Sequence, residues 1–322
     1  MEYRKIGKWG IKVSEIGLGS WLTYGQSVSE AESAKQIDYA FQNGINFFDT
    51  ANVYGLGSGE QAVGKALHKL RRDSYVLATK VFFPMGEGPN DRGLSRKHIF
   101  EQCHASLQRL QTDYIDLYQC HRYDRSVTVY EIVRSMDDLA RQGKILYWGV
   151  SEWSAEQIES AVKVAEEISA LPPISNQPQY NMLGRDIEEN VLPTCKKLGL
   201  GQVVFSPLAQ GVLTGKYKLG GPLPEHSRAA DDRISGFIHG KLTKENLLIV
   251  EELKSIASNL HISMAQLALA WCLRIPEISS TIIGATTIAH IEANIKASGL
   301  KIPNEFLTKI DDLLKSKVAS RG

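Results

Sequence analysis

Short apolar runs alternate with longer amphipathic stretches along most of the chain. The apolar runs predict eight strands, at residues 13–20, 45–50, 75–80, 114–119, 144–151, 174–179, 201–208 and 280–286. Several of these runs are continuously apolar instead of alternating, as expected of strands that are buried on both faces. Sustained alternation of strand and helix implies a parallel sheet.

The stretches between the apolar runs have helical periodicity. They predict helices at residues 29–44, 59–70, 95–110, 128–143, 154–168, 185–199 and 288–299. Ser95 and Ser154 occupy positions typical of N-caps. Gly44, Gly143 and Gly199 occupy positions where glycine commonly ends a helix.

The number of units and the chain length together predict a barrel. An eight-unit barrel typically needs about 250 residues, which leaves roughly 70 of the 322 residues for additions. These additions are a hairpin at 3–17, a long loop at 207–241 and two helices at 263–274 and 304–316. We therefore predict an α/β fold, a (β/α)8 TIM barrel with an N-terminal β-hairpin and extra helices near the C-terminus. Residues 1–322 are expected to form a single domain.

Composition excludes several classes of function. Hydrophobic residues make up 43% of the chain and charged residues 23%, and the formal net charge is only +1, so no nucleic-acid partner is expected. Four widely spaced cysteines without a C-x-x-C pair indicate reduced thiols instead of disulfides or a zinc site. The N-terminus is too polar for a secretory signal, and no apolar run is long enough to span a membrane. We expect a soluble, cytoplasmic protein with no membrane insertion.

Acidic and basic side chains recur where the predicted strands end. Asp49 ends the second strand, with Tyr54 in the loop beyond, Lys80 ends the third and His121 follows the fourth. Taken singly, each has an ordinary structural explanation, such as a turn cap, core packing or a satisfied buried histidine. In a barrel, however, the carboxyl ends of the strands carry the active site, and all four residues fall at that end of adjacent strands.

Proton transfer to a carbonyl oxygen is the chemistry that these four residues could share. A free tyrosine titrates near pH ~10, and a neighbouring ammonium lowers that pKa by stabilising phenolate. Asp49 would keep Lys80 charged, and His121 could orient the substrate oxygen. None of the four supplies a hydride, so a cofactor is required.

Three other chemistries fit the sequence less well. Residues 57–62 match the dinucleotide fingerprint G-x-G-x-x-A but do not directly follow a strand, so a glycine-rich turn is the simpler interpretation. The overlapping P-loop-like stretch has Ala66 where Ser or Thr should bind magnesium. A metal-dependent hydrolase needs more ligands than His121, and Cys120 should point to the opposite face of its strand from His121. No metal site is predicted.

Several separated motifs resemble those of the aldo-keto reductases, over essentially the whole chain. The resemblance is strongest to the branch that contains the β subunits of voltage-gated potassium channels. The motifs are, in order, GLGSW, FFDTANVYG, ATKV, DYIDLYQCH, WGVSEW, PPISNQPQYNML, FSPLAQGVLTGKY and QLALAWCLR. The resemblance implies a (β/α)8 barrel with an N-terminal hairpin and bound NADP(H).

The resemblance also implies the functional residues. The catalytic tetrad would be Asp49, Tyr54, Lys80 and His121, with Tyr54 as general acid. The implied cofactor-binding residues are Ser20, Trp21, Gln26, Asp49, Ser151, Gln177, Phe205, Ser206, Pro207, Leu208, Gln210, Lys216, Ser227, Arg228, Gly284, Thr286, His290 and Asn294. Within this set Ser151 and Gln177 would hold the nicotinamide carboxamide, and Phe205 takes the place of the aromatic residue that stacks on the ring. The stretch from Ser206 to Arg228 would fold over the pyrophosphate, and Gly284 to Asn294 would line the adenosine. Trp21 would also border the substrate pocket.

Three positions depart from the family pattern. Glu152 follows Ser151 where the wider family often has Asn and the channel branch has Arg. Ala293 replaces a carboxylate that commonly meets the adenine, and His290 replaces an Arg or Gln near the 2′-phosphate. These changes leave the tetrad intact and bear on the preference for NADPH over NADH.

The predicted function is NADP(H)-dependent reduction of aldehydes or ketones to alcohols, with a small carbonyl substrate as the partner. The alternative is a potassium-channel β-subunit-like regulatory protein that binds NADPH and has weak reductase activity. His121 stands where the channel branch has Asn, and Met1 directly precedes the hairpin without an extension that could plug a pore, so the sequence does not support a channel partner. A homo-oligomer and the identity of the carbonyl substrate stay open at this point.

Overall fold

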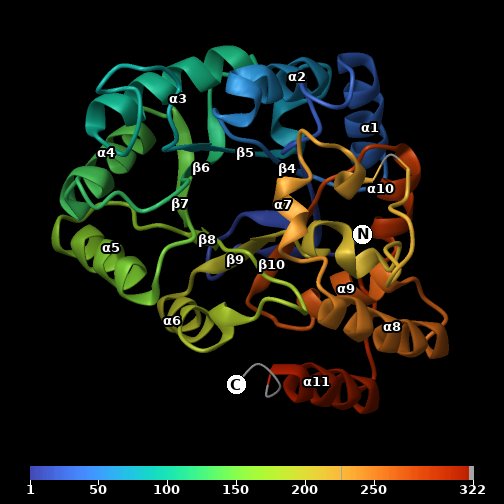
Figure 1. The fold of residues 1–322 in the computed structure, drawn as a ribbon. Coiled ribbons are helices and arrows are strands. Elements are labelled where there is room, and N and C mark those ends of the chain that lie inside the picture. The colour runs from blue at the N-terminus through green and yellow to red at the C-terminus, as the bar shows by residue number, and fades with distance from the viewer. Residues whose placement is uncertain (226, 319–322) are drawn as a thin grey trace.

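Eight parallel strands close into a barrel in the computed structural model, which describes residues 1–225 and 227–318 (Figure 1). The strand order around the barrel is β10-β3-β4-β5-β6-β7-β8-β9. The strands are β3 (Ile16–Gly19), β4 (Phe47–Asp49), β5 (Val76–Val81), β6 (Ile115–Cys120), β7 (Ile145–Ser151), β8 (Ser175–Gln177), β9 (Gly201–Phe205) and β10 (Ile278–Ile283). Each lies within or beside a predicted apolar run, so the predicted barrel is confirmed.

The helices that follow the strands form a ring outside the barrel (Figure 1). They are α1 (Glu30–Gln42), α2 (Ser58–Leu67), α3 (Arg96–Leu110), α4 (Val129–Arg141), α5 (Ala155–Glu167), α6 (Val191–Leu198) and α10 (Ile288–Ile295). The predicted caps are confirmed: Ser95 accepts from the His98 N–H, and Ser154 forms a capping box with Gln157. Gly199 ends α6 in the left-handed conformation, at φ 78°.

Two apolar layers stabilise the barrel. Inward-facing side chains such as Phe47, Leu117 and Val203 fill its interior, together with Ile6 and Val13 from the N-terminal hairpin. A larger layer lies between the strands and the helices. The barrel is therefore a packed core and not a channel.

The N-terminal hairpin, β1 (Tyr3–Lys5) and β2 (Lys12–Ser14), covers the end of the barrel at which the strands begin. Arg4 donates a 2.9 Å hydrogen bond to the carbonyl of Ile278, the first residue of β10. The Ser14 N–H donates to Asn46 Oδ1 at 2.7 Å, one residue before β4. Because the hairpin covers this end, only the opposite end, where the strands finish, is left for the loops that carry the active site in barrels of this kind.

The glycine-rich turn at 57–62 leads into α2. Gly57 has φ 98°, and Glu60, three residues later, is fully buried. Glu60 accepts hydrogen bonds from Thr79 Oγ1 at 2.5 Å and from Arg109 Nε at 2.6 Å. A closed barrel is not a doubly wound fold, so the interpretation of this stretch as a turn is the correct one.

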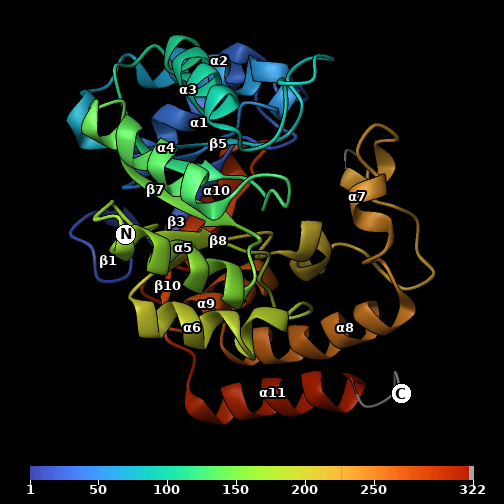
Figure 2. The same cartoon turned by 90° about the vertical axis from the view of Figure 1, so that its left-hand side faces the viewer.

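Additional helices lie in the C-terminal third. The predicted helices appear as α9 (Met264–Leu273) and α11 (Asn304–Val318), and α11 lies along α8 (Lys244–Asn259) in both views (Figures 1 and 2). No element had been predicted at the position of α8. The predicted loop at 207–241 contains the short helix α7 (Gly236–His239) and two 3-10 helices, Ala209–Thr214 and Arg228–Ala230. We call residues 207–241 the strap.

The structure also bears on membrane-spanning helices, on metal sites and on the state of the cysteines. Among the described residues, no single helix has both the length and the apolar content to cross a membrane, and α8 and α9 together meet those criteria only as a pair bent by 88°. In the same part of the chain, no group of three or more His, Cys, Asp and Glu side chains could hold a metal ion. The four cysteines are free and buried, and burial raises the pKa of each thiol.

Candidate active site

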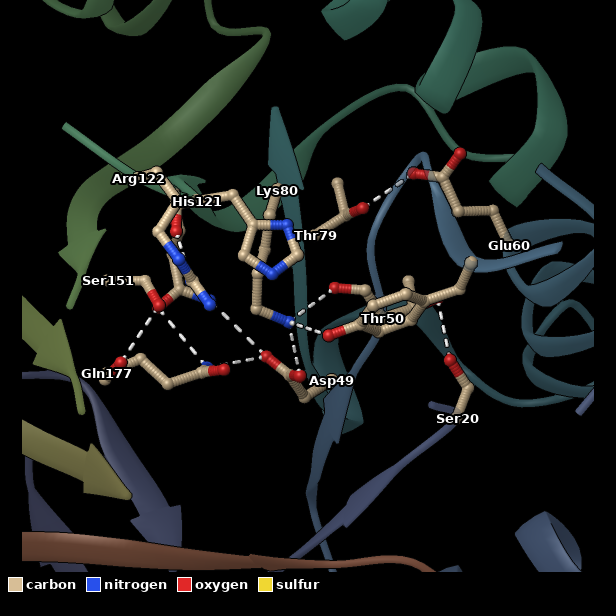
Figure 3. Close-up of polar contacts among 12 residues, drawn as sticks. Ser20, Asp49, Thr50, Glu60, Thr79, Lys80, His121, Arg122, Ser151 and Gln177 are labelled. Atoms are coloured by element: carbon tan, nitrogen blue, oxygen red, sulfur yellow. Dashed lines mark hydrogen bonds and ion pairs between the residues drawn. The ribbon is translucent and has the colours of Figure 1, made fainter. Parts of the chain in front are cut away.

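A buried ion pair lies at the end of the barrel where the strands finish (Figure 3). Lys80 on β5 is fully buried, and its Nζ lies 2.5 Å from Asp49 Oδ1 on the neighbouring strand β4. The same ammonium donates to the Thr50 carbonyl at 2.7 Å and to the Tyr54 hydroxyl at 3.4 Å. Burial lowers the pKa of Lys80, but Asp49 and Tyr54 raise it by more, so the net direction is upward. Lys80 therefore remains a cation at neutral pH.

Amides from two further strands fix the other oxygen of Asp49. Gln177 Nε2 at the end of β8 donates to Asp49 Oδ2 at 2.9 Å, and Gln119 Nε2 on β6 donates to it at 3.3 Å. Gln119 is not among the site residues predicted from the sequence. The available signal was its position two residues before His121, since residues i and i+2 of a strand face the same side.

Tyr54 reaches this pair from the loop after β4. It begins a 3-10 turn, Tyr54–Gly57, in which Gly55 and Leu56 have φ of 57° and 51°. Burial is the largest influence on the Tyr54 hydroxyl and raises its pKa, whereas Lys80 lowers it. The influence of Lys80 has the predicted sign, but the net direction is upward because burial outweighs it. The phenol is thus protonated at neutral pH.

His121 lies directly after β6 and beside the phenol. Its ring is 5.8 Å from the Tyr54 ring and 4.9 Å from the Phe83 ring, between centroids. Burial, Lys80 and Arg122 all lower the pKa of the imidazole, which falls well below its usual value. Nδ1 is buried and has no hydrogen-bond partner among the described residues. A neutral imidazole has one N–H to donate.

The four side chains that the sequence placed at strand ends thus lie together. Polar residues predicted for the cofactor extend the network: Ser151 Oγ donates to the Gln177 carbonyl at 2.9 Å, and Ser20 Oγ to Thr50 Oγ1 at 2.8 Å. This arrangement provides a cation, a protonated phenol and a neutral imidazole at the end of a closed barrel. It can donate a proton to an oxygen and stabilise the charge left behind.

The chain turns sharply between the end of β9 and the first residues of the strap. Ser206 and Gln210 have φ of 54° and 60°, a left-handed conformation uncommon for residues other than glycine. Gln210 Nε2 donates to Ser206 Oγ at 2.6 Å, and Asn181 Nδ2 donates to the Ser206 carbonyl at 3.0 Å. Such strained backbone is often found at ligand sites. Phe205, the last residue of β9, directly precedes this turn and is half-buried.

Two cations of the strap lack a counter-charge. Among the described residues, no carboxylate forms an ion pair with Lys216 or Arg228. Burial lowers the pKa of both side chains, and the charge of Arg228 lowers the pKa of Lys216 further. Arg228 Cζ lies 5.7 Å from the Trp21 ring, which also contacts the Phe237 ring at 5.0 Å. The strap therefore packs against the loop after β3.

Several buried polar atoms beside these cations are unsatisfied. Ser227 Oγ, Gln210 Oε1 and the Tyr217 hydroxyl have no hydrogen-bond partner among the described residues. Buried polar groups are nearly always paired, so unpaired ones near free cations fit an anionic, hydrogen-bonding ligand.

The remaining predicted cofactor residues lie around the end of β10 and on neighbouring loops. Thr286 Oγ1 and His290 Nδ1 are 3.3 Å apart. Burial is the largest cause that lowers the pKa of His290, and the charge of Lys216 is the second. The influence of Lys216 indicates that α10 lies near the strap. A Cβ added at Gly284 would meet no atom within 4 Å, so the space there is open. Gln26 is exposed and Asn294 is buried, whereas the side chains of Pro207 and Leu208 have no hydrogen-bonding group.

Comparisons with known proteins agree with this geometry. The model of the Aldo/keto reductase family matches residues 15–315. A probable voltage-gated potassium channel subunit beta from Arabidopsis thaliana is 42% identical over 322 residues, with 98% of each chain covered, and one from Oryza sativa subsp. japonica has the same identity and coverage. A putative subunit of the same name from Schizosaccharomyces pombe is 43% identical, covering 97% of this chain and 93% of its own.

Proposed function

The chain belongs to the aldo/keto reductase family, and from this premise we propose that it is an NADP(H)-dependent reductase that converts aldehydes or ketones to alcohols. The observation that carries the proposal is the Tyr54 hydroxyl, 3.4 Å from a Lys80 ammonium that Asp49 holds at 2.5 Å. A protonated phenol beside a fixed cation is suited to protonating a carbonyl oxygen.

Tyr54 would act as the general acid. Its raised pKa keeps the proton in place until the oxygen of the substrate gains negative charge. Lys80 would then stabilise the phenolate, because the ammonium is buried and already oriented. The neutral His121 would donate a hydrogen bond to the same oxygen and so orient the carbonyl.

The residues fit NADP(H). Lys216 and Arg228 are cations without carboxylate partners in the described part of the chain, and Ser227 and Gln210 have buried unsatisfied oxygens, which suits phosphate groups. Ser151 and Gln177 would hold the carboxamide, with Phe205 against the ring. When bound, NADPH supplies the hydride that reduces the carbonyl carbon.

The direct test is repeated turnover. We expect oxidation of NADPH, followed by its absorbance, to proceed over many cycles with a reactive aldehyde such as 4-nitrobenzaldehyde. A panel of aldehydes and ketones would then rank substrates. Absence of turnover with every carbonyl compound, despite demonstrated NADPH binding, would reject a reductase function.

A second function is favoured by the names of the relatives. Three relatives that match nearly the full chain are named potassium channel β subunits. The chain would then bind NADPH and regulate a channel, with weak reductase activity. The neutral imidazole of His121 beside the Tyr54 phenol argues for the enzyme.

Replacement of His121 separates the two functions. In an enzyme, His121→Asn lowers kcat/KM for aldehydes while NADPH affinity is kept, because the imidazole acts on the substrate oxygen and not on the nucleotide. In a regulatory protein, a single turnover followed by very slow NADP⁺ release is expected, and the replacement leaves that behaviour as it was. Stopped-flow fluorescence of both proteins distinguishes these outcomes.

A further inference from the structure

Arg122 is a cation at the edge of the tetrad. It directly follows His121, and one of its terminal nitrogens donates to the His121 carbonyl at 2.6 Å. Figure 3 shows Arg122 next to His121, and its guanidinium lies 5.5 Å from the centroid of the Phe83 ring. The Phe83 ring in turn contacts the His121 ring. The side chain is half-buried. Arg122 is thus held beside the imidazole by a hydrogen bond and by an aromatic face.

The charge of Arg122 is not balanced by a neighbouring carboxylate. Within residues 1–225 and 227–318, no acid forms an ion pair with it. The acid closest in sequence, Asp124, accepts instead from the Leu94 N–H at 2.8 Å and from the Ser126 N–H and hydroxyl at 2.9 and 2.6 Å. A guanidinium has five N–H groups, and the His121 carbonyl accepts from only one in this part of the chain.

The position of Arg122 separates it from the cations assigned to the nucleotide. Lys216 and Arg228 belong to the strap after β9, whereas Arg122 lies on the loop between β6 and α4. After burial and Lys80, Arg122 is the next influence that lowers the pKa of His121, so its charge reaches the tetrad. Lys80 is neutralised by Asp49. Arg122 is therefore the uncompensated charge beside the imidazole.

We propose that Arg122 selects carbonyl substrates that carry a carboxylate, which its guanidinium binds while the carbonyl oxygen meets Tyr54 and His121. A planar guanidinium matches a carboxylate in shape, with two parallel hydrogen bonds. One guanidinium also balances the single charge of a carboxylate, whereas a phosphate would call for a second free cation. This inference rests on the proposed reductase function and names its substrate class.

Paired benzaldehydes test the proposal. The nitro group of 3- or 4-nitrobenzaldehyde is similar in shape to the carboxylate of 3- or 4-carboxybenzaldehyde but carries no net charge. The quantity to compare is the ratio of kcat/KM, carboxy over nitro, in the unmodified protein and in Arg122→Gln. Intrinsic reactivity cancels in this comparison. Loss of charge-assisted hydrogen bonds should lower the ratio roughly 10- to 100-fold for the better-placed isomer. Arg122→Lys keeps the positive charge but lacks the planar, forked guanidinium. Its carboxy-over-nitro ratio should therefore lie between the ratios of the unmodified protein and of Arg122→Gln.

Arg125→Gln is the matched control. Arg125 is exposed on the same loop, so its replacement removes the same charge without touching the tetrad, and the ratio should stay within about twofold. An unchanged ratio in Arg122→Gln would overturn the proposal and leave Arg122 as a support for His121 and Phe83. An equal drop in both variants would also overturn it, because general attraction of anions would then explain the selectivity.

Failure of the reductase function can be recognised separately. If the unmodified protein turns over neither aldehyde, calorimetric titration with benzoate and benzamide, with and without NADP⁺, tests anion binding alone. Benzoate should bind more tightly than benzamide, and Arg122→Gln should abolish the difference. Equal binding of the two compounds to the unmodified protein would refute a carboxylate site.

Discussion

Lys80 and Tyr54 show how burial and charge compete at one atom. Burial favours the neutral phenol, and the ammonium 3.4 Å away favours phenolate. The net upward direction of the Tyr54 pKa suits an acid, because the proton is present at neutral pH. Once it leaves, the buried Lys80 ammonium faces the phenolate in surroundings where charge interactions are strong.

Replacement of the phenol tests this role. Tyr54→Phe should lower carbonyl turnover by roughly 10²- to 10⁴-fold, the usual contribution of a positioned general acid, while NADPH binding persists. Steady-state rates and a nucleotide titration measure the two effects. Tyr118→Phe is the control, since that hydroxyl is buried on β6 and donates to the Ile99 carbonyl at 3.3 Å. Near-normal turnover in Tyr54→Phe would remove Tyr54 from the mechanism.

Some of these site residues could be predicted from the sequence, and others could not. Asp49, Lys80 and His121 could be predicted to meet because ionisable side chains at the ends of apolar strands need partners. Gln119 resembles an ordinary buried amide, and only the structure shows that it donates to Asp49. The net direction of the Tyr54 pKa was also beyond the sequence, since it depends on how deeply the loop after β4 covers the phenol.

Among the elements, the strap has the backbone that is hardest to predict from the sequence. It also contains Lys216 and Arg228, the two cations without carboxylate partners in the described part of the chain. Its 3-10 helices and the four-residue α7 are too short to show periodicity, and contacts such as Trp21 with Phe237 locate them. Helix α8 is different. Leu247, Val250 and Ala257 recur near helical spacing after the N-cap Thr243, so its sequence did contain a signal that the prediction left unassigned.

From the unpaired cations of the strap we predict that the protein binds NADPH more tightly than NADH. Arg228→Ala should weaken NADPH binding roughly 10- to 100-fold, because an unpaired guanidinium suits a phosphate, and the unmodified protein should bind NADPH more tightly than NADH. Tryptophan fluorescence titration is a suitable measurement, since Trp21 lies 5.7 Å from Arg228. Arg233→Ala is the matched control, an exposed strap arginine paired with Asp231 at 2.7 Å. Equal affinities for the two nucleotides would refute the preference without affecting the family assignment.

At the scale of the whole molecule, the two ends of the barrel have different tasks. The hairpin covers the end where strands begin, so Ile6 and Val13 complete the interior there. The other end buries Lys80, Asp49 and His121, and their burial makes the chemistry depend on the same packing that stabilises the fold. Stability and protonation at this end are therefore linked.

This linkage predicts a loss of stability in mild acid. In the unfolded chain His121 takes up a proton as the pH falls through about 6.5, whereas in the folded protein its pKa lies well below the usual value. Protons thus favour the unfolded state, and the contribution of His121 to stability is present above pH ~6.5 and is lost below it, until the folded-state pKa is reached. Between pH 7.5 and 5.5 the loss is at most about 1.4 kcal/mol.

Urea unfolding of the unmodified protein and of His121→Gln at both pH values measures this loss. The free energy of unfolding should change less between the two pH values in the variant. His68→Gln, at an exposed histidine, should behave like the unmodified protein. If His121→Gln keeps the full pH dependence, the imidazole of the folded protein is protonated in the same range as in the unfolded chain, and a neutral His121 is ruled out.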